Sequence, residues 1–205
     1  MDIKNFPKIT IILRGYTFSQ VRTVMKAMSQ SSIRSVEITL NTEGALDMIK
    51  EFSKEFEDTM TVGAGTVKNF KQAKEAIDAG AKFILSPVVL SKEVMDLCKK
   101  HSVISVVGAM TPSEINNSFE DGADIVKVFP AVSCGSRYFK DVKAPLGDLP
   151  LMAVGGVNKN NAKEFLENGA NYLGIGSGVF KKEDVVNENL EGLIASLKEF
   201  EAKLN

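Results

Sequence analysis

The residue with the clearest chemical potential in this sequence is a lysine inside an apolar stretch. Lys127 lies in the segment Ile125-Val-Lys-Val128, which predicts a strand, and Pro130 follows shortly after it. In one interpretation, the lysine extends its ammonium group from the end of the strand into solvent. In the other, burial and a nearby cation lower the pKa of the amine, and the free amine attacks a carbonyl carbon to form a Schiff base.

Two further charged residues occupy similar places in earlier apolar runs. Glu37 lies within one such run, and Arg14 directly follows another. Taken separately, Glu37 could form an ion pair with Lys127 or Arg34, and Arg14 could be a surface residue. Beside an imine, however, a carboxylate can move protons, and a guanidinium group binds a carboxylate or a phosphate. Together, the three residues favour the interpretation in which Lys127 reacts.

Glycine-rich loops follow the last two apolar runs of the chain. They have the sequences Val154-Gly-Gly-Val157 and Gly174-Ile-Gly-Ser-Gly178. A glycine pair often marks only a tight turn. In parallel α/β barrels, however, the loops after the seventh and eighth strands bind phosphate through their backbone N–H groups. We therefore expect a phosphate site in these loops.

Short β-branched runs alternate with longer segments of helical periodicity along nearly the whole chain. The predicted strands are Ile9–Leu13, Ile33–Ile38, Met60–Val62, Phe83–Leu85, Ile104–Val106, Ile125–Val128, Leu151–Val154 and Tyr172–Ile175. Capping boxes and C-terminal glycines mark the ends of the helices between them, at Thr17, Asn69, Thr111, Gly80, Gly122 and Gly169.

Eight strand–helix units fit either a doubly wound sheet or a closed (β/α)8 barrel. The barrel is favoured because the count is eight and because no G-x-G-x-x-G follows the first strand. We therefore predict an α/β protein with a single TIM-barrel domain over residues 1–205. The chain is short for this fold, so we also expect short loops.

In such a barrel, the active site lies at the carboxyl ends of the strands, and alternate residues of each strand point inward. Arg14, Glu37 and Lys127 then point toward one mouth of the barrel. The same reasoning adds Thr66, if the face that it shares with Val62 points inward. A cation, an acid, an amine and a hydroxyl group would thus meet at one site.

The composition argues against several classes of protein. The chain has 205 residues, and 25 Lys and Arg balance 26 Asp and Glu, so no basic surface predicts nucleic-acid binding. No apolar run is long enough to span a membrane, and the start lacks the apolar stretch of a secretory signal, so we expect a cytoplasmic protein. Cys98 and Cys134 are expected to be free thiols, and the single histidine, His101, is expected at a helix end. We predict neither a metal site nor a cofactor.

Several motifs, in order along nearly the whole chain, resemble those of the class I aldolases of 2-keto-3-deoxy-6-phospho sugar acids. The motifs are Ile12-Leu-Arg-Gly15, Val36-Glu-Ile-Thr-Leu40, Val62-Gly-Ala-Gly-Thr-Val67, Leu85-Ser-Pro87, Met110-Thr-Pro-Ser-Glu114, Val126-Lys-Val-Phe-Pro-Ala131 and Val154-Gly-Gly-Val157. The resemblance implies a metal-independent enzyme that cleaves a phosphorylated keto-deoxy sugar acid to pyruvate and glyceraldehyde 3-phosphate.

The resemblance also implies roles for individual residues. Lys127 would form the Schiff base, and Glu37 would move protons. Arg14 and Thr66 would bind the pyruvyl end of the substrate. The phosphate would be held by Gly155, Gly156, Gly176 and Ser177. Because members of this family are similar in forming homotrimers, a homotrimer is implied as well.

Two departures from the family pattern leave the configuration of the sugar open. Many phosphogluconate-type members have Arg where Asn41 stands and Thr where Val154 stands, so this chain looks more like the phosphogalactonate type. Activity on 4-hydroxy-2-oxoglutarate is also left open. Two other functions would suit the same barrel: a phosphosugar isomerase or epimerase that uses no covalent lysine, and a noncatalytic phosphate-binding protein.

Overall fold

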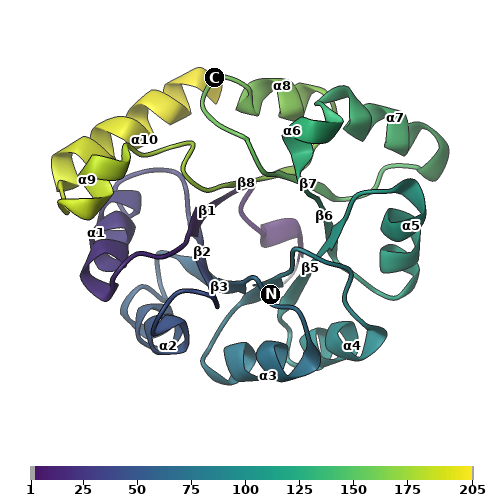
Figure 1. Ribbon diagram of the computed structural model, residues 1–205, viewed down its shortest axis with the longest axis horizontal. Coiled ribbons are helices and arrows are strands. Elements are labelled where there is room, and N and C mark those ends of the chain that lie inside the picture. The colour runs from purple at the N-terminus through teal and green to yellow at the C-terminus, as the bar shows by residue number, and fades with distance from the viewer. Residues whose placement is uncertain (1–2, 205) are drawn as a thin grey trace.

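Eight parallel strands close into a barrel in the computed structural model, which describes residues 3–204 (Figure 1). Each strand pairs with the next along the chain, and the last pairs with the first. The strands are β1 (Ile9–Leu13), β2 (Ser35–Thr39), β3 (Thr61–Gly65), β4 (Phe83–Leu85), β5 (Ile104–Ala109), β6 (Ile125–Val128), β7 (Leu151–Val154) and β8 (Tyr172–Ile175). The predicted (β/α)8 barrel is confirmed.

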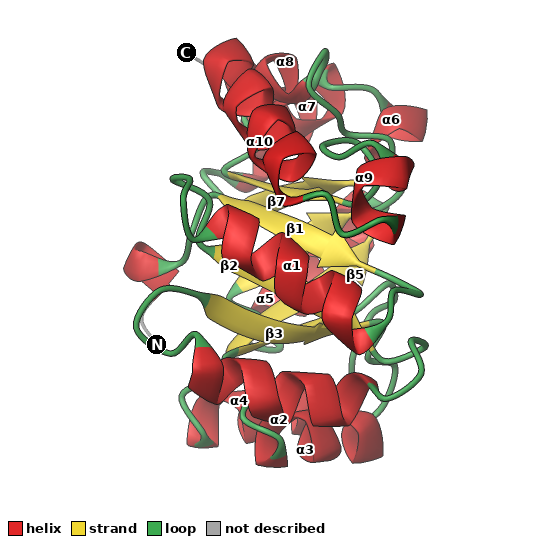
Figure 2. Ribbon diagram, turned by 90° about the vertical axis from the view of Figure 1, so that its left-hand side faces the viewer, coloured by secondary structure: helices red, strands yellow, loops and turns green. Residues whose placement is uncertain are grey.

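Helices surround the barrel, and most of them connect its strands, whereas the short helix before the first strand lies within the ring of strands in the view of Figure 1 (Figures 1 and 2). They are η1 (Ile3–Asn5), α1 (Phe18–Met28), α2 (Ala45–Glu55), α3 (Phe70–Asp78), α4 (Lys92–Lys100), α5 (Pro112–Glu120), α6 (Ala131–Cys134), α7 (Arg137–Leu146), α8 (Ala162–Glu167), α9 (Lys182–Val186) and α10 (Leu190–Leu204). The capping boxes predicted at Thr17 and Thr111 are present. The box at Asn69 is incomplete, because the Gln72 side chain accepts the N–H of Lys68 instead.

Three helices end at a glycine in the left-handed region, as the sequence predicts. Gly80, Gly122 and Gly169 follow α3, α5 and α8 with φ angles of 102°, 100° and 101°. Residues with a side chain rarely adopt this conformation, so the glycine lets the chain leave the helix and turn toward the next strand. This joint repeats along the barrel and helps to keep the loops at its amino-terminal end short.

Two apolar layers hold the barrel together. The outer layer lies between the strands and the helices and includes Ile11 and Val36. The inner layer includes Phe6, just before β1, and Phe83, the first residue of β4, whose rings meet edge to face at 5.2 Å. Because these rings close the amino-terminal end of the barrel, the carboxyl end is left for polar side chains.

The inward face of β3 differs from the prediction. Val62 and Ala64 pack in the outer layer, so the expectation that their face points inward is wrong. Gly65 faces inward, and a Cβ atom there would lie 1.5 Å from a carboxylate oxygen of Glu37. Because glycine carries no side chain, the apolar residues of this segment mark only the face of the strand that points outward. Thr66 lies outside the strand with a φ of 58°, so the alternation of the strand does not fix where its side chain points.

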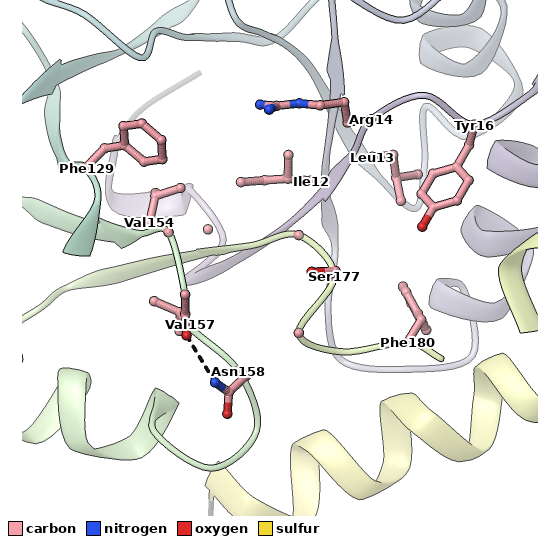
Figure 3. A pocket seen from close by; sticks show the side chains of 15 residues that line it. Ile12, Leu13, Arg14, Tyr16, Phe129, Val154, Val157, Asn158, Ser177 and Phe180 are labelled. Carbon is pink, nitrogen blue, oxygen red and sulfur yellow. Dashed lines mark hydrogen bonds between the residues drawn. The ribbon is translucent and has the colours of Figure 1, made fainter. Parts of the chain in front are cut away.

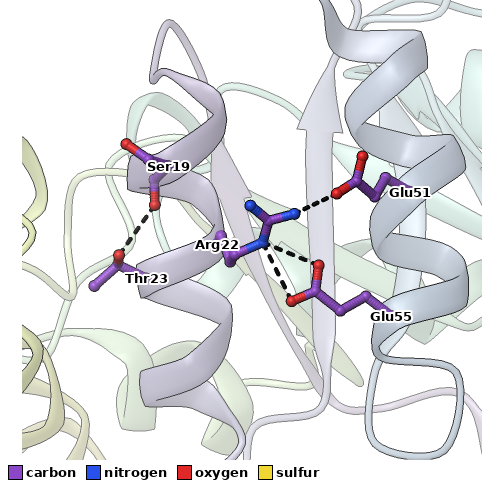
Figure 4. Close-up of polar contacts among 5 residues, drawn as sticks. All are labelled: Ser19, Arg22, Thr23, Glu51 and Glu55. Atoms are coloured by element: carbon purple, nitrogen blue, oxygen red, sulfur yellow. Dashed lines mark hydrogen bonds and ion pairs between the residues drawn. The ribbon is translucent and has the colours of Figure 1, made fainter.

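A charged cluster joins α1 to α2 on the outside of the barrel (Figure 4). Arg22 Nε donates to both carboxylate oxygens of Glu55, at 3.0 and 3.2 Å, and the guanidinium group also pairs with Glu51. The same guanidinium lies 5.0 Å and 5.4 Å from the ring centres of Phe18 and Phe52. These contacts fix the two helices that follow β1 and β2.

Candidate active site

The structure brings Lys127, Glu37 and Arg14 together at the carboxyl end of the barrel. Lys127 comes from β6 and Glu37 from β2, and the two residues are only 4% and 1% exposed. Arg14 follows β1, and its positive charge acts on both of them. A buried amine and a buried carboxylate therefore lie within the electrostatic reach of an exposed guanidinium group.

Glu37 is a buried carboxylate with an unsatisfied oxygen. Its Oε2 atom has no hydrogen-bond partner among the described residues. Burial raises the pKa of Glu37 to about 7, although Lys127 and Arg14 act in the opposite direction. A carboxyl group with this pKa can both accept and donate a proton near neutral pH.

The ion pairs considered for Glu37 in the sequence do not form. Arg34 donates instead to the carbonyl oxygens of Met28 and Ser29, at 3.3 and 3.0 Å, where α1 ends. Within residues 3–204, Lys127 is not in ion-pair contact with Glu37 either, although their charges interact. One buried carboxylate oxygen of Glu37 is therefore left without a partner among the described residues.

Lys127 is placed so that its amine is more easily deprotonated than usual. Burial lowers the pKa of Lys127, the Glu37 carboxylate opposes this shift, and Arg14 adds to it. The ring centre of Phe129 lies 4.6 Å from Lys127 Nζ, which favours the ammonium form. The net direction is the one that a Schiff-base lysine requires, since only the free amine is a nucleophile.

A cavity of about 500 Å³ opens at the carboxyl ends of β1, β7 and β8 (Figure 3). The Arg14 side chain projects toward Phe129 in this view. The predicted phosphate-binding residues line the same cavity, namely Gly155, Gly156, Gly176 and Ser177. Thr66 does not line it. The cavity therefore joins the guanidinium group to both glycine loops. Neither Lys127 nor Glu37 lines it, but Phe129 does, and the ring centre of Phe129 lies 4.6 Å from Lys127 Nζ.

The glycine loop after β7 has its carbonyl groups already occupied. The Val132 N–H donates to the Gly155 carbonyl oxygen at 3.1 Å. The side-chain amides of Asn158 and Asn161 donate to the Gly156 carbonyl oxygen at 3.0 and 3.1 Å. No described residue accepts the N–H of either glycine. These two donors are therefore available to an anion in the cavity.

The further side chains that line the cavity include Tyr16, Phe129 and Asn158, to which the sequence assigned no role. The position of Phe129 could have been predicted from the sequence, because it lies two residues after Lys127 and so continues the inward face of the strand. Tyr16 and Asn158 lie in loops, where no periodicity tells which way a side chain points. Their positions depend on the path of the chain between elements.

The histidine and the two cysteines, to which the sequence gave no catalytic role, do not line this cavity. His101 caps the C-terminal end of α4, at the predicted helix end. Cys98 and Cys134 are free thiols, as predicted, and burial raises the pKa of Cys98 to about 12. In the described part of the chain, no cluster of three His, Cys, Asp or Glu side chains could hold a metal ion. Within the same range, no helix is long and apolar enough to cross a bilayer.

A family described as KDPG and KHG aldolase matches residues 3–196. The chain belongs to this aldolase family. Among relatives in the family, the 2-dehydro-3-deoxy-phosphogluconate aldolase of Pseudoalteromonas atlantica is 37% identical over 142 residues, which cover 69% of this chain and 65% of that protein. The probable 2-dehydro-3-deoxy-6-phosphogalactonate aldolase of Rhizobium meliloti is 29% identical over 192 residues, covering 93% of this chain and 90% of that one.

The fold of this aldolase family member also matches solved structures. A structure described as native KDPGal superimposes with a TM-score of 0.87 and 26% identity, over 100% of this chain and 99% of that chain. The similarity therefore extends over the whole barrel, including the strands that carry Lys127 and Glu37. The family assignment and the geometry of the site thus point to the same chemistry.

Proposed function

We infer that the protein is a class I aldolase that acts on a phosphorylated keto-deoxy sugar acid. It cleaves 2-keto-3-deoxy-6-phosphogluconate, or the galactonate epimer, to pyruvate and glyceraldehyde 3-phosphate. The observation that carries this inference is the buried amine of Lys127 beside the buried carboxyl group of Glu37. Membership in the aldolase family supports the same reaction class.

The first half of the reaction forms the covalent intermediate. The free amine of Lys127 attacks C2 of the substrate, and the resulting carbinolamine loses water to give a protonated imine. The lowered pKa of Lys127 increases the fraction of free amine at neutral pH. Because the protonated imine itself accepts the electrons of the bond that breaks, we propose that the reaction needs no metal ion.

The second half of the reaction breaks the C3–C4 bond. Glu37 takes the proton of the C4 hydroxyl group, glyceraldehyde 3-phosphate leaves, and the electron pair moves to the imine nitrogen, giving an enamine. Glu37 then returns the proton to C3, and water hydrolyses the imine to release pyruvate and the free amine. A pKa near neutrality suits a group that must both take and give a proton in one cycle.

The remaining predicted residues are assigned to binding. Arg14 suits the substrate carboxylate because its planar fork can make two hydrogen bonds to it. The N–H groups of the glycine loops suit the phosphate, on the evidence of their free donors. For Thr66, a role at the pyruvyl end rests on the resemblance alone. 4-Hydroxy-2-oxoglutarate has no phosphate for these loops, so we propose it only as a weaker second substrate.

The products distinguish this function from its alternatives. Incubation with either phosphorylated substrate should release pyruvate and glyceraldehyde 3-phosphate in equal amounts. An isomerase or epimerase would consume the substrate without releasing pyruvate. A noncatalytic phosphate-binding protein would bind the substrate and leave it intact. Either of those results would overturn the proposal.

We also propose that the enzyme is a cytoplasmic homotrimer. Apolar side chains at the carboxyl ends of β4 and β5 support a subunit contact, because Val88 and Val89 are each 45% exposed and Met110 is 43% exposed. A charged phosphorylated substrate does not cross a bilayer unaided, which favours an enzyme inside the cell. Analytical ultracentrifugation would measure the number of subunits.

Gly65→Ala is expected to lower kcat about 100-fold by displacing Glu37. The new Cβ atom would lie 1.5 Å from Glu37 Oε1, so the carboxylate has to move, and small displacements of a reacting group cost about this much. Gly63→Ala is the matched control, because its Cβ would lie 2.4 Å from Phe83 and disturb the inner apolar layer instead. Melting temperature and kcat should be measured together. Wild-type kcat in folded Gly65→Ala would show that the position of Glu37 does not matter.

Val154→Thr is expected to shift the substrate preference toward the gluco epimer. Val154 ends β7 and lines the cavity, and valine offers no hydrogen bond to a sugar hydroxyl group. The parent should therefore accept both epimers or prefer the galacto form. Threonine should add at most roughly 0.5 to 1.5 kcal/mol of discrimination. Comparing kcat/KM for the two epimers, with Val154→Ala as control, measures this. A parent that already prefers the gluco form by about a hundredfold would contradict this role of Val154.

A further inference from the structure

Two buried threonine hydroxyl groups lie beside the backbone of Arg14. Thr39 is the last residue of β2 and is fully buried, and Thr42, in the loop that follows, is 6% exposed. Neither residue lines the cavity, and neither has a role in the proposed reaction. Both follow Glu37 closely in the sequence, at the carboxyl end of the same strand.

Hydrogen bonds link these hydroxyl groups into a chain. The Gly15 N–H donates to Thr42 Oγ1 at 2.9 Å, and Thr42 Oγ1 lies 3.0 Å from Thr39 Oγ1. Thr39 Oγ1 donates to the Leu13 carbonyl oxygen at 3.4 Å. Each hydroxyl group has one proton, so Thr42 must donate to Thr39. The chain thus begins one residue after Arg14 and ends one residue before it.

The Arg14 side chain forms no hydrogen bond or ion pair with the rest of the described chain. A second cavity, also of about 500 Å³, is lined by Gly15, Tyr16 and Thr42. Tyr16 also lines the first cavity, so the loop after β1 lies between the two. The direction of the unpartnered guanidinium group therefore depends on how its backbone is held.

We propose that Thr39 and Thr42 are positioning residues that aim the guanidinium group of Arg14 at the substrate carboxylate. The inference rests on the proposed function, which places a carboxylate at this point. By fixing the peptide groups before and after Arg14, the hydroxyl chain fixes the direction in which its side chain leaves the backbone. A planar two-bond contact between guanidinium and carboxylate needs such alignment. Alignment before binding also lowers the entropic cost of holding the substrate.

Substitution of Thr42 tests the hydroxyl group. Thr42→Val keeps the shape of the side chain and removes the hydroxyl, whereas Thr42→Ser keeps the hydroxyl. In the aldol addition direction, the KM for pyruvate should rise roughly tenfold in Thr42→Val, the effect of misaligning one charge-assisted contact. In Thr42→Ser it should stay within about twofold. Because Thr42→Val also leaves the Gly15 N–H without an acceptor, all variants are compared well below their melting temperatures.

A double-mutant cycle with Arg14→Met separates positioning from a merely structural role. If Thr42 acts through Arg14, then Thr42→Val adds no further increase in the KM for pyruvate once Arg14 has been replaced. An equal increase with and without Arg14 would show that Thr42 acts independently of it. That result would overturn the proposal even if both variants fold normally.

The pKa of Glu37, measured by NMR, gives a readout that needs no catalysis. The charged groups that act on Glu37 are Lys127 from β6 and Arg14, directly after β1. Since Arg14 lowers the pKa of Glu37, Thr42→Val should raise this pKa, and should leave it unchanged in the Arg14→Met background. Absence of this coupling overturns the positioning role whatever the activity. If the coupling is found in a protein that forms no adduct with pyruvate, the proposed function is wrong and the positioning role stands.

Discussion

Lys127→Ala is expected to lower kcat/KM for the phosphorylated substrate by several orders of magnitude. Without the amine no imine forms, and among the described residues no other group is placed to accept the electrons of the C3–C4 bond. Lys127→Met should be equally inactive, and it fills more of the space that the lysine leaves inside the barrel. Steady-state assays of pyruvate release would measure the loss.

Lys82→Ala is the matched control for this substitution. Lys82 is exposed and lies directly before β4, at the opposite end of the strands from the active site. Its replacement should leave kcat/KM unchanged. Substantial activity in both Lys127 variants would mean that the reaction does not pass through a covalent lysine, as in an isomerase or epimerase on the same barrel.

Glu37→Gln is expected to lower kcat by about 10²- to 10⁴-fold, the usual contribution of a general acid–base group, with little change in KM. Glutamine keeps the size of the side chain but can neither take the C4 proton nor return it to C3. The exposed Glu57, in the turn before β3, provides the control Glu57→Gln. A Glu37→Gln variant with unchanged kcat would exclude this residue as the proton-transfer group.

The pH dependence of the cleavage rate should reflect the protonation of Glu37. Burial raises the pKa of Glu37 to about 7, so the carboxyl group stays protonated over a wider acidic range than an exposed glutamate. Cleavage needs the deprotonated form, so the wild-type rate should rise as the pH increases toward and through about 7. Glu37→Gln should lack this rise. An identical acidic limb in both proteins would assign it to another group.

Much of the barrel could be predicted from the sequence because its strands are β-branched runs between clear helix signals. The bounds of β1, β4, β6, β7 and β8 agree with the prediction. The predicted carboxyl ends of two other strands were too short, because those ends contain glycine. β3 extends to Gly65, and β5 continues through Gly108 to Ala109. At Gly108 a Cβ atom would lie 2.5 Å from the backbone of Pro87, so close packing requires glycine there. Glycine has a low strand propensity, and its presence therefore made the strand harder to predict.

The candidate site could be predicted only where strand alternation applies. Lys127 and Glu37 lie within strands, so their inward direction follows from the pleat, and Arg14 continues the same alternation. Thr66 follows its strand with a left-handed φ, and alternation gives no information beyond that point. The contacts of Thr39 with Thr42 depend on the path of a loop, which no residue spacing predicts.

The proposed reaction requires that Lys127 form a Schiff base with the keto group of the substrate. Incubation with pyruvate and borohydride tests it most directly, because the imine forms with loss of water and the hydride reduces it to a stable secondary amine. Peptide mass spectrometry should find one reduced pyruvate on Lys127 in the wild type and in Lys82→Ala, and none in Lys127→Ala. No adduct in the wild type, or an adduct confined to another lysine, would show that Lys127 does not form the Schiff base.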